Sequence, residues 1–175
     1  MILAPLFGTV AGLLMLAGLL KLRSPARGND TYPAPGAALG VRGTRIAAVA
    51  EIGLGCVALA APGRVVAATC GAAFAAFAAY TIRLMAASDG PADCGCFGES
   101  GGTVGPGHVL LDLACAAVGL GAAIAPPRTL ASIVAEAPLT GAVLVCGIAA
   151  AVYALYLAYT ALPEAWSAYA GGAQR

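Results

Sequence analysis

Two cysteines separated by a single glycine, Cys94 and Cys96, are the residues of this chain best suited to carry out chemistry. They lie in a polar, glycine-rich stretch, Asp93-Cys94-Gly95-Cys96-Phe97-Gly98, of a chain that is otherwise strongly apolar. Paired thiols of this kind can exchange a disulfide with a partner, form an inert structural disulfide, or bind a soft metal such as Cu(I) or Zn(II).

Redox exchange is the chemistry that this spacing favours most. Gly95 lets the backbone bend enough for a bond between Cys94 and Cys96 to close, but with strain, and strained, exposed disulfides are the readily exchanged ones. An inert disulfide across so small a ring would add little stability, because loop entropy grows with loop length. Two thiolates cannot complete a tetrahedral thiolate site, so no metal is predicted to be required. The metal alternative would need a mixed ligand set, namely Cys94, Cys96, His108 and Asp112.

The composition is that of an integral membrane protein. The 175 residues are 61% hydrophobic and only 10% charged, with a mean hydropathy of +0.89, whereas soluble domains carry roughly 25% charged residues. No length is left for a soluble domain. The net charge of +1 argues against nucleic acid as a partner.

Five apolar segments are predicted to span the lipid bilayer of the cell membrane, with roughly 17–25 residues for each crossing. They cover residues 2–22, 46–61, 65–87, 108–125 and 137–162. No alternating strand pattern occurs, so the predicted fold class is an all-α, multi-pass membrane protein. We expect a four-helix bundle over residues 1–125, with the redox loop at 88–107, and a fifth span with a C-terminal tail over 126–175.

The alternation of the spans brings most polar residues to the membrane face that carries the cysteine loop, here called the cysteine face. Glu51 lies in the second span, Arg83 closes the third, and His108 and Asp112 open the fourth. A charge within the hydrocarbon region costs roughly 2.5–3.5 kcal/mol, so such residues pair with one another or serve function. We expect these four residues to approach one another beneath the cysteine loop and to support its site.

Plainer interpretations of these residues stay open. Glu51 could form a structural ion pair with Arg83 or Arg45, and His108 could simply begin a helix at the membrane interface. The four remaining cysteines each lie singly in a span and are predicted to be small apolar fillers. Cys56 and Cys115 both fall near the middle of the membrane, where a second relay pair is conceivable.

Small residues are expected to mediate helix packing. Gly8 and Gly12 form a Gly-x-x-x-Gly pattern in the first span, which lets two helix backbones approach closely. The third span carries small residues at the same four-residue spacing, at Ala68, Ala72 and Ala76.

Several of these segments resemble the methylamine utilisation protein MauE family within the DoxX-like membrane proteins. The resemblance is carried by the Cys-Gly-Cys-Phe-Gly motif, by Tyr80-Thr81-Ile82-Arg83-Leu84 before it, and by the region from His108 to Asp112 after it. Gly18-Leu19-Leu20-Lys21-Leu22-Arg23 is similar to the end of that family's first span, and Ala50-Glu51-Ile52-Gly53-Leu54-Gly55 to its acidic motif.

The resemblance implies a membrane protein of four or five spans linked to thiol redox chemistry. The role that names the family is the maturation or transport of the disulfide-rich small subunit of methylamine dehydrogenase, usually together with a thioredoxin-like partner. The implied activity is a thiol–disulfide oxidoreductase that uses Cys94 and Cys96. The alternative is a non-enzymatic scaffold or transport component that holds a maturing partner.

The plan of the chain also resembles vitamin K epoxide reductase-like enzymes, which place a cysteine pair at the start of the fourth span and use a quinone. Their pair has the spacing Cys-x-x-Cys, whereas Cys94 and Cys96 are closer, so a quinone is the weaker option. Orientation stays open. Basic residues gather on the cysteine face and predict a cytoplasmic location for it, whereas disulfide chemistry predicts the extracytoplasmic side.

Overall fold

Five long helices and one short helix make up the described part of the chain. The computed structural model describes residues 3–23, 40–87, 95–97 and 104–161. The helices, in chain order, are α1 (Leu3–Arg23), α2 (Gly40–Ala60), α3 (Arg64–Ala87), α4 (Pro106–Ile124), α5 (Leu130–Glu136) and α6 (Pro138–Thr160). No strand occurs within these ranges, in agreement with the predicted all-α class.

The five long helices, α1, α2, α3, α4 and α6, are each long and apolar enough to cross a membrane. They confirm the five predicted spans, although α2 begins at Gly40 rather than at residue 46. The short helix α5 was not predicted. It begins after Thr129, whose hydroxyl oxygen accepts a 3.1 Å hydrogen bond from the backbone amide of Ser132 and so caps the helix.

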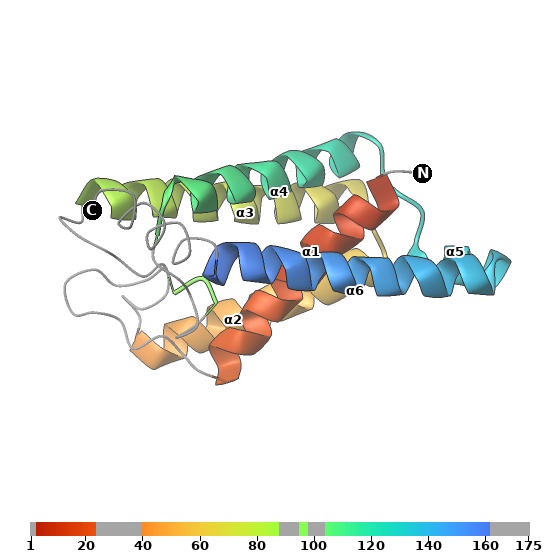
Figure 1. Ribbon diagram of the computed structural model, residues 1–175, viewed down its shortest axis with the longest axis horizontal. Coiled ribbons are helices and arrows are strands. Elements are labelled where there is room, and N and C mark those ends of the chain that lie inside the picture. Colours follow the sequence, from red (N-terminus) through yellow and green to blue (C-terminus); the bar gives the residue numbers. More distant parts are fainter. Residues whose placement is uncertain (1–2, 24–39, 88–94, 98–103, 162–175) are drawn as a thin grey trace, which may run out of the picture.

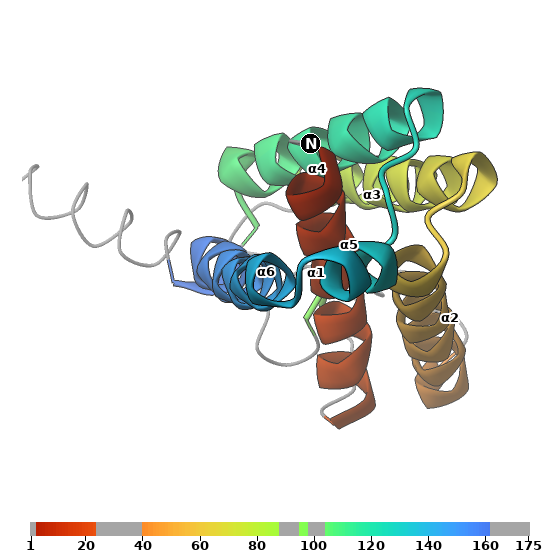
Figure 2. The same ribbon diagram turned by 90° about the vertical axis from the view of Figure 1, so that its right-hand side faces the viewer.

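The bundle is organised around α1. Figure 2 shows α1 at the centre with the other long helices around it, and α3 and α4 lie side by side in both views (Figures 1 and 2). In Figure 1, α1, α3 and α6 end where α2 and α4 begin, whereas α5 lies at the opposite end. The cysteine face therefore receives the ends of three spans and the starts of two, as the alternation of spans requires.

Glycines set the closest helix contacts. A Cβ atom added at Gly119 of α4 would lie 2.6 Å from the backbone nitrogen of Gly71 in α3, so these two helices touch backbone to backbone. A Cβ atom at Gly18 of α1 would lie 2.5 Å from the Ala48 carbonyl oxygen of α2. Small residues at such crossings allow van der Waals packing between helices that have no hydrophobic driving force between them in lipid.

The predicted small-residue surface of the first span is confirmed, and that of the third span is wrong by one position. Gly8 and Gly12 face Ile148 and Val152 of α6, so α6 packs on α1 there. On α3, however, Ala72 and Ala76 are exposed. The buried stripe that meets α4 instead contains Ala67, Cys70, Gly71, Phe74 and Ala78.

The last span, α6, is the most peripheral of the five long helices. Its most apolar window is only 11% buried, against 50% for α1. Its large outward-facing side chains, such as Leu139 and Val143, are suited to contact lipid. Near its end, however, Tyr159 is 2% exposed and reaches back into the bundle. The proposed division of the chain at residue 125 stays a prediction.

Candidate functional site

A tight turn at residues 95–97 presents Cys96 to the bundle. Gly95 has φ of 60°, a left-handed conformation that glycine adopts without strain, and it bends the chain immediately before Cys96. The other cysteine of the pair, Cys94, lies outside the described residues, as does most of the loop at 88–107. The left-handed conformation of Gly95 agrees with the bend that the sequence predicts at this residue.

Phe97 anchors this turn to the end of α6. Its side chain is 3% exposed. Its ring packs edge-on against the rings of Tyr156 and Tyr159, with centroids 5.7 Å and 5.2 Å apart. Such aromatic contacts add roughly 0.5–1.5 kcal/mol each beyond the area they bury. The phenylalanine of the Cys-Gly-Cys-Phe-Gly motif therefore fixes the position of Cys96 relative to the fifth span.

A buried hydrogen bond lies directly beneath the turn. The Tyr159 hydroxyl donates to Asp112 Oδ1 at 2.8 Å, and the two residues are 2% and 3% exposed. Asp112 lies in the second turn of α4, which begins at Pro106, a residue well suited to the first turn of a helix. The bond joins the fourth span to the fifth. It also gives the Asp112 carboxyl group a partner in an apolar interior, where an unpaired polar group costs free energy.

His108 completes the cluster one helical turn above Asp112. Its side chain is 2% exposed, and its ring packs edge-on against Tyr159 with centroids 5.4 Å apart. The imidazole Nε2 is buried and has no hydrogen-bond partner among the described residues. His108, Asp112 and Cys115 form a buried stripe along α4, with the Cys115 thiol beside the Tyr159 hydroxyl.

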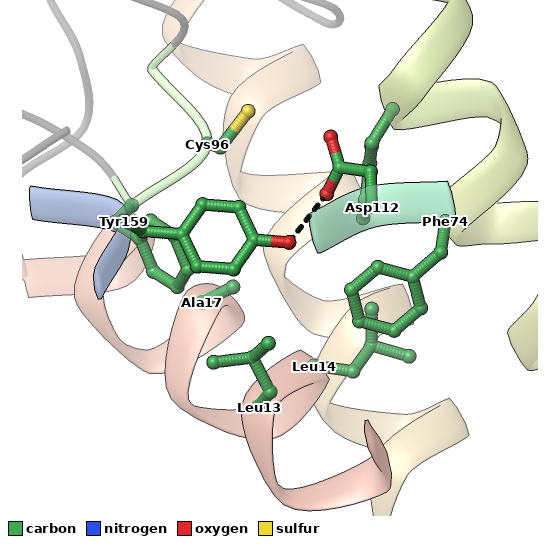
Figure 3. A pocket seen from close by; sticks show the side chains of 9 residues that line it. Leu13, Leu14, Ala17, Phe74, Cys96, Asp112 and Tyr159 are labelled. Atoms are coloured by element: carbon green, nitrogen blue, oxygen red, sulfur yellow. Dashed lines mark hydrogen bonds between the residues drawn. The ribbon is translucent and has the colours of Figure 1, made fainter. Parts of the chain in front are cut away.

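A small cavity of about 10 Å³ separates Cys96 from this cluster. Figure 3 shows Cys96, Asp112 and Tyr159 around it, above apolar side chains of α1 and α3. Its lining consists of Leu13, Leu14, Ala17, Phe74, Phe77, Cys96, Phe97, Asp112 and Tyr159. A cavity of this size admits about one water molecule, roughly 10–15 Å³ being the minimum required.

The sequence suggested that Glu51 could form an ion pair with Arg83 or Arg45, but Glu51 pairs with neither of them. Its Oε1 accepts a hydrogen bond in a buried ion pair with the ammonium of Lys21, at the end of α1. Glu51 and Lys21 are 8% and 7% exposed, whereas Arg83 and Arg45 are both exposed. Lysine is preferred as the partner because α1 and α2 pack closely, which places Lys21 opposite Glu51 inside the bundle.

The expected four-residue cluster is therefore divided in two. His108 and Asp112 lie together beneath the cysteine turn, Glu51 forms a separate pair with Lys21, and Arg83 points outward. Phe77 contacts both groups: it lines the cavity, and the centroid of its ring lies 5.2 Å from the Lys21 nitrogen. The functional role of Glu51, Arg83, His108 and Asp112 stays a prediction.

The remaining cysteines occupy different surroundings. Cys70 and Cys115 are buried in the bundle, whereas Cys56 and Cys146 are exposed on its outer surface. The opposite exposure of Cys56 and Cys115 does not support a relay between them. Within the described ranges, no group of three or more histidine, cysteine, aspartate or glutamate side chains is arranged to hold a metal ion.

Two residues of the site, Lys21 and Tyr159, were not predicted from the sequence. Lys21 belongs to the segment that resembles the end of the MauE family's first span, and Tyr159 had no predicted role. The signal for Tyr159 was available in principle, because five alternating spans return the end of the fifth to the cysteine face. Tyrosine carries no charge, however, and therefore did not stand out against the apolar background of α6.

The helices and their polar cluster define a multi-pass, all-α membrane protein with a buried polar site under one face. The family model of the methylamine utilisation protein MauE matches residues 1–125, and the chain belongs to this family. Membership supports a role in methylamine utilisation. No curated protein and no solved structure matches the chain. Tyr159 lies beyond the matched residues, so the site combines the family region with the fifth span.

Proposed function

We propose that the protein is a membrane thiol–disulfide redox protein in which Cys94 and Cys96 exchange a disulfide with a partner. Its role would be to support the maturation of a disulfide-rich client such as the small subunit of methylamine dehydrogenase. Membership of the MauE family supports the link to methylamine utilisation. The chemistry itself is inferred from the cysteine pair and its surroundings.

The observation that carries the proposal is the position of Cys96. The turn holds it over a cavity whose polar lining is the buried Asp112–Tyr159 hydrogen bond. An inert cysteine of a membrane helix needs no polar group beside it and behaves as a small apolar side chain. A thiol that gains and loses a proton in each exchange step, by contrast, gains from a neighbouring group that can hold that proton.

The bend at Gly95 favours an exchangeable bond over a structural one. A backbone in the left-handed region at the residue between the cysteines shortens the path from one to the other. A disulfide across so small a ring restricts the unfolded chain very little, so it would contribute little to stability. The cysteine pair is therefore better explained by exchange chemistry than by a structural disulfide.

Turnover needs a second redox partner, because exchange only passes a disulfide from one pair of thiols to another. We propose a separate thioredoxin-like protein for this role, with a membrane quinone as the weaker option. Neither a metal nor another cofactor is required by the proposed reaction. The cavity beneath Cys96 is large enough for about one water molecule and too small for a quinone ring.

Trapping of a mixed disulfide tests the proposal. In each single variant, Cys94→Ser and Cys96→Ser, the remaining thiol should stay bonded to a partner protein, visible as a reducible, higher-mass band in cells grown on methylamine. Cys146→Ser, at an exposed cysteine of α6, is the matched control and should leave the wild-type pattern unchanged. Full activity of both single variants with no trapped partner would leave the scaffold function as the better explanation.

A further inference from the structure

The Asp112–Tyr159 hydrogen bond uses only part of the hydrogen-bonding capacity of the carboxyl group. Tyr159 donates to Oδ1, and in Figure 3 the second oxygen of Asp112 lies on the side of the Cys96 sulfur. A carboxyl group in its neutral form could carry a proton on that oxygen and still accept the hydrogen bond from Tyr159. An ionised carboxylate at this position would have a single hydroxyl donor in an apolar interior, which costs free energy.

We propose that Asp112 donates a proton to the Cys96 sulfur when a disulfide between Cys94 and Cys96 opens, and that Tyr159 positions the carboxyl group for this transfer. The inference rests on the proposed exchange function and assigns Cys96 as the leaving thiol. Cys96 is placed for this role because it lines the cavity shared with Asp112 and Tyr159.

A thiolate of a partner protein attacks the Cys94 sulfur, a new disulfide forms there, and the bond between Cys94 and Cys96 breaks. The electron pair of that bond leaves on the Cys96 sulfur, which takes the proton from Asp112, directly or through one water molecule in the cavity. The products are a mixed disulfide at Cys94, a neutral thiol at Cys96 and an Asp112 carboxylate, which then regains a proton from water on the cysteine face.

The surroundings explain why a proton is needed. The cavity is lined mainly by apolar side chains from α1 and α3, where a bare thiolate on Cys96 would place an uncompensated charge in a poorly solvated space. Delivery of the proton in the same step leaves a single new charge, on Asp112, where the Tyr159 hydroxyl already donates a hydrogen bond.

The other titratable groups described near the cavity do not line it. On α4 they are His108, whose ring contacts Tyr159, and Cys115, whose thiol is beside the Tyr159 hydroxyl. On α6, Tyr156 contacts Phe97 by its ring. From α3, only the rings of Phe74 and Phe77 line the cavity. The ammonium of Lys21 in α1, which pairs with Glu51 of α2, lies 5.2 Å from the centroid of the Phe77 ring.

The test follows the opening of the disulfide in the full-length protein in detergent micelles, with dithiothreitol as the attacking thiol. The rate is divided by the concentration of dithiothreitol thiolate, and new thiols at Cys94 and Cys96 are located by alkylation and mass spectrometry. In the wild type, this corrected rate should fall with rising pH, because the proton donor is lost when Asp112 ionises.

Asp112→Asn should be slower by about tenfold or more at the acidic end and nearly independent of pH, since general acid catalysis contributes roughly 10²–10⁴-fold. Tyr159→Phe should be slower but keep the pH dependence, as expected for a positioning residue. Tyr156→Phe removes a hydroxyl from the neighbouring ring and should behave as the wild type, and so should Cys115→Ala. Circular dichroism and the melting temperature of each variant check its folding.

An unchanged pH dependence in Asp112→Asn, with normal opening of the disulfide, would overturn the proton-donor role and leave the proposed function intact. Loss of the pH dependence in Cys115→Ala would overturn it as well, since the donor would then be that thiol. If oxidised wild-type protein gains no alkylatable thiol at Cys94 or Cys96 on reduction, both the proposed function and the proton donor are wrong.

Discussion

Tyr159, near the end of the fifth span, donates a 2.8 Å hydrogen bond to Asp112, in the second turn of the fourth. Both residues are almost completely buried, and the bond lies beneath the turn that carries Cys96. The fifth span therefore does more than lengthen the bundle: its end supplies the hydroxyl that pairs the one buried carboxyl group lining the cavity, and an aromatic surface on which Phe97 rests.

Tyr159→Phe should lower the stability of the protein. The substitution keeps the ring contacts with Phe97 and His108 but leaves Asp112 Oδ1 without its donor, at a cost of about 1–3 kcal/mol for an unsatisfied buried polar group. Unfolding in mixed micelles of mild detergent and dodecyl sulfate measures the change. Tyr156→Phe, with the same chemical change beside it, should stay within about 0.5 kcal/mol of the wild type.

Replacing Lys21 by methionine should destabilise the protein more than any change to an exposed ion pair. It leaves Glu51 as an uncompensated buried charge, and removal of one partner from a buried ion pair typically lowers the free energy of unfolding by about 3–5 kcal/mol. The double variant Lys21→Met/Glu51→Gln should recover much of that loss, because no charge is then buried. Unfolding of these two variants and of the wild type in the same mixed micelles measures the difference.

The control for this pair is the exposed ion pair of Arg128 and Glu136 on the opposite face. Glu136→Ala should cost at most about 1 kcal/mol, as exposed pairs do. Equal losses in Lys21→Met and Glu136→Ala would contradict the structural role assigned to the buried pair.

Gly119→Ala should loosen the contact between α3 and α4. The added methyl group would lie 2.6–2.7 Å from backbone atoms of Gly71, which cannot move aside as a side chain can. The helices must separate, so the melting temperature should fall by several degrees, corresponding to about 1–3 kcal/mol for overpacking. Gly147→Ala, in α6 with open space around it, should be neutral or stabilising by up to about 1 kcal/mol. A lower melting temperature in Gly147→Ala alone would contradict the packing described.

Membrane orientation follows from single cysteines placed on the two faces of a chain whose native cysteines are removed. Gly107→Cys lies on the cysteine face at the start of α4, and Ala131→Cys lies in α5 on the opposite face; both positions are exposed. Disulfide chemistry outside the cytoplasm predicts that an impermeant maleimide labels Gly107→Cys in intact cells and Ala131→Cys only after permeabilisation.

The reverse labelling pattern would follow the positive-inside rule. Among the described residues, four exposed arginines lie on the cysteine face, Arg23, Arg42, Arg45 and Arg83, whereas Lys21 is already neutralised by Glu51 within the bundle. That pattern would place the cysteine pair in the cytoplasm and would contradict a role in oxidative maturation.

The sequence alone predicts the features that depend on the length of the apolar segments and on the order of the spans. Apolar length predicted the five spans, and their alternation placed Asp112, His108 and Cys96 at one end of the bundle. Contacts that depend on how each helix is rotated could not be obtained this way. The stripe of α3 that meets α4 is displaced by one residue from the predicted alanines, because it is centred on the close approach of Gly71 to Gly119.

The partner of Glu51 could not be predicted for the same reason. Arginine at 45 or 83 satisfies the alternation of the spans as well as Lys21 does, and only the packing of α1 on α2 selects the lysine. The burial of Tyr159 was harder still to predict. In a helix rich in apolar and aromatic residues, nothing in the local sequence distinguishes Tyr159 from Tyr153, which is exposed.

The redox state of Cys94 and Cys96 in living cells tests the central claim most directly. Acid quenching followed by alkylation with a mass-tagged maleimide counts the reduced thiols at these two positions. The account predicts a mixture of oxidised and reduced pair in normal cells, and a shift in that ratio when a genetically neighbouring thioredoxin-like protein is deleted. A shift only when quinone synthesis is blocked would favour the quinone route. A pair that stays in one state under both conditions would contradict redox cycling.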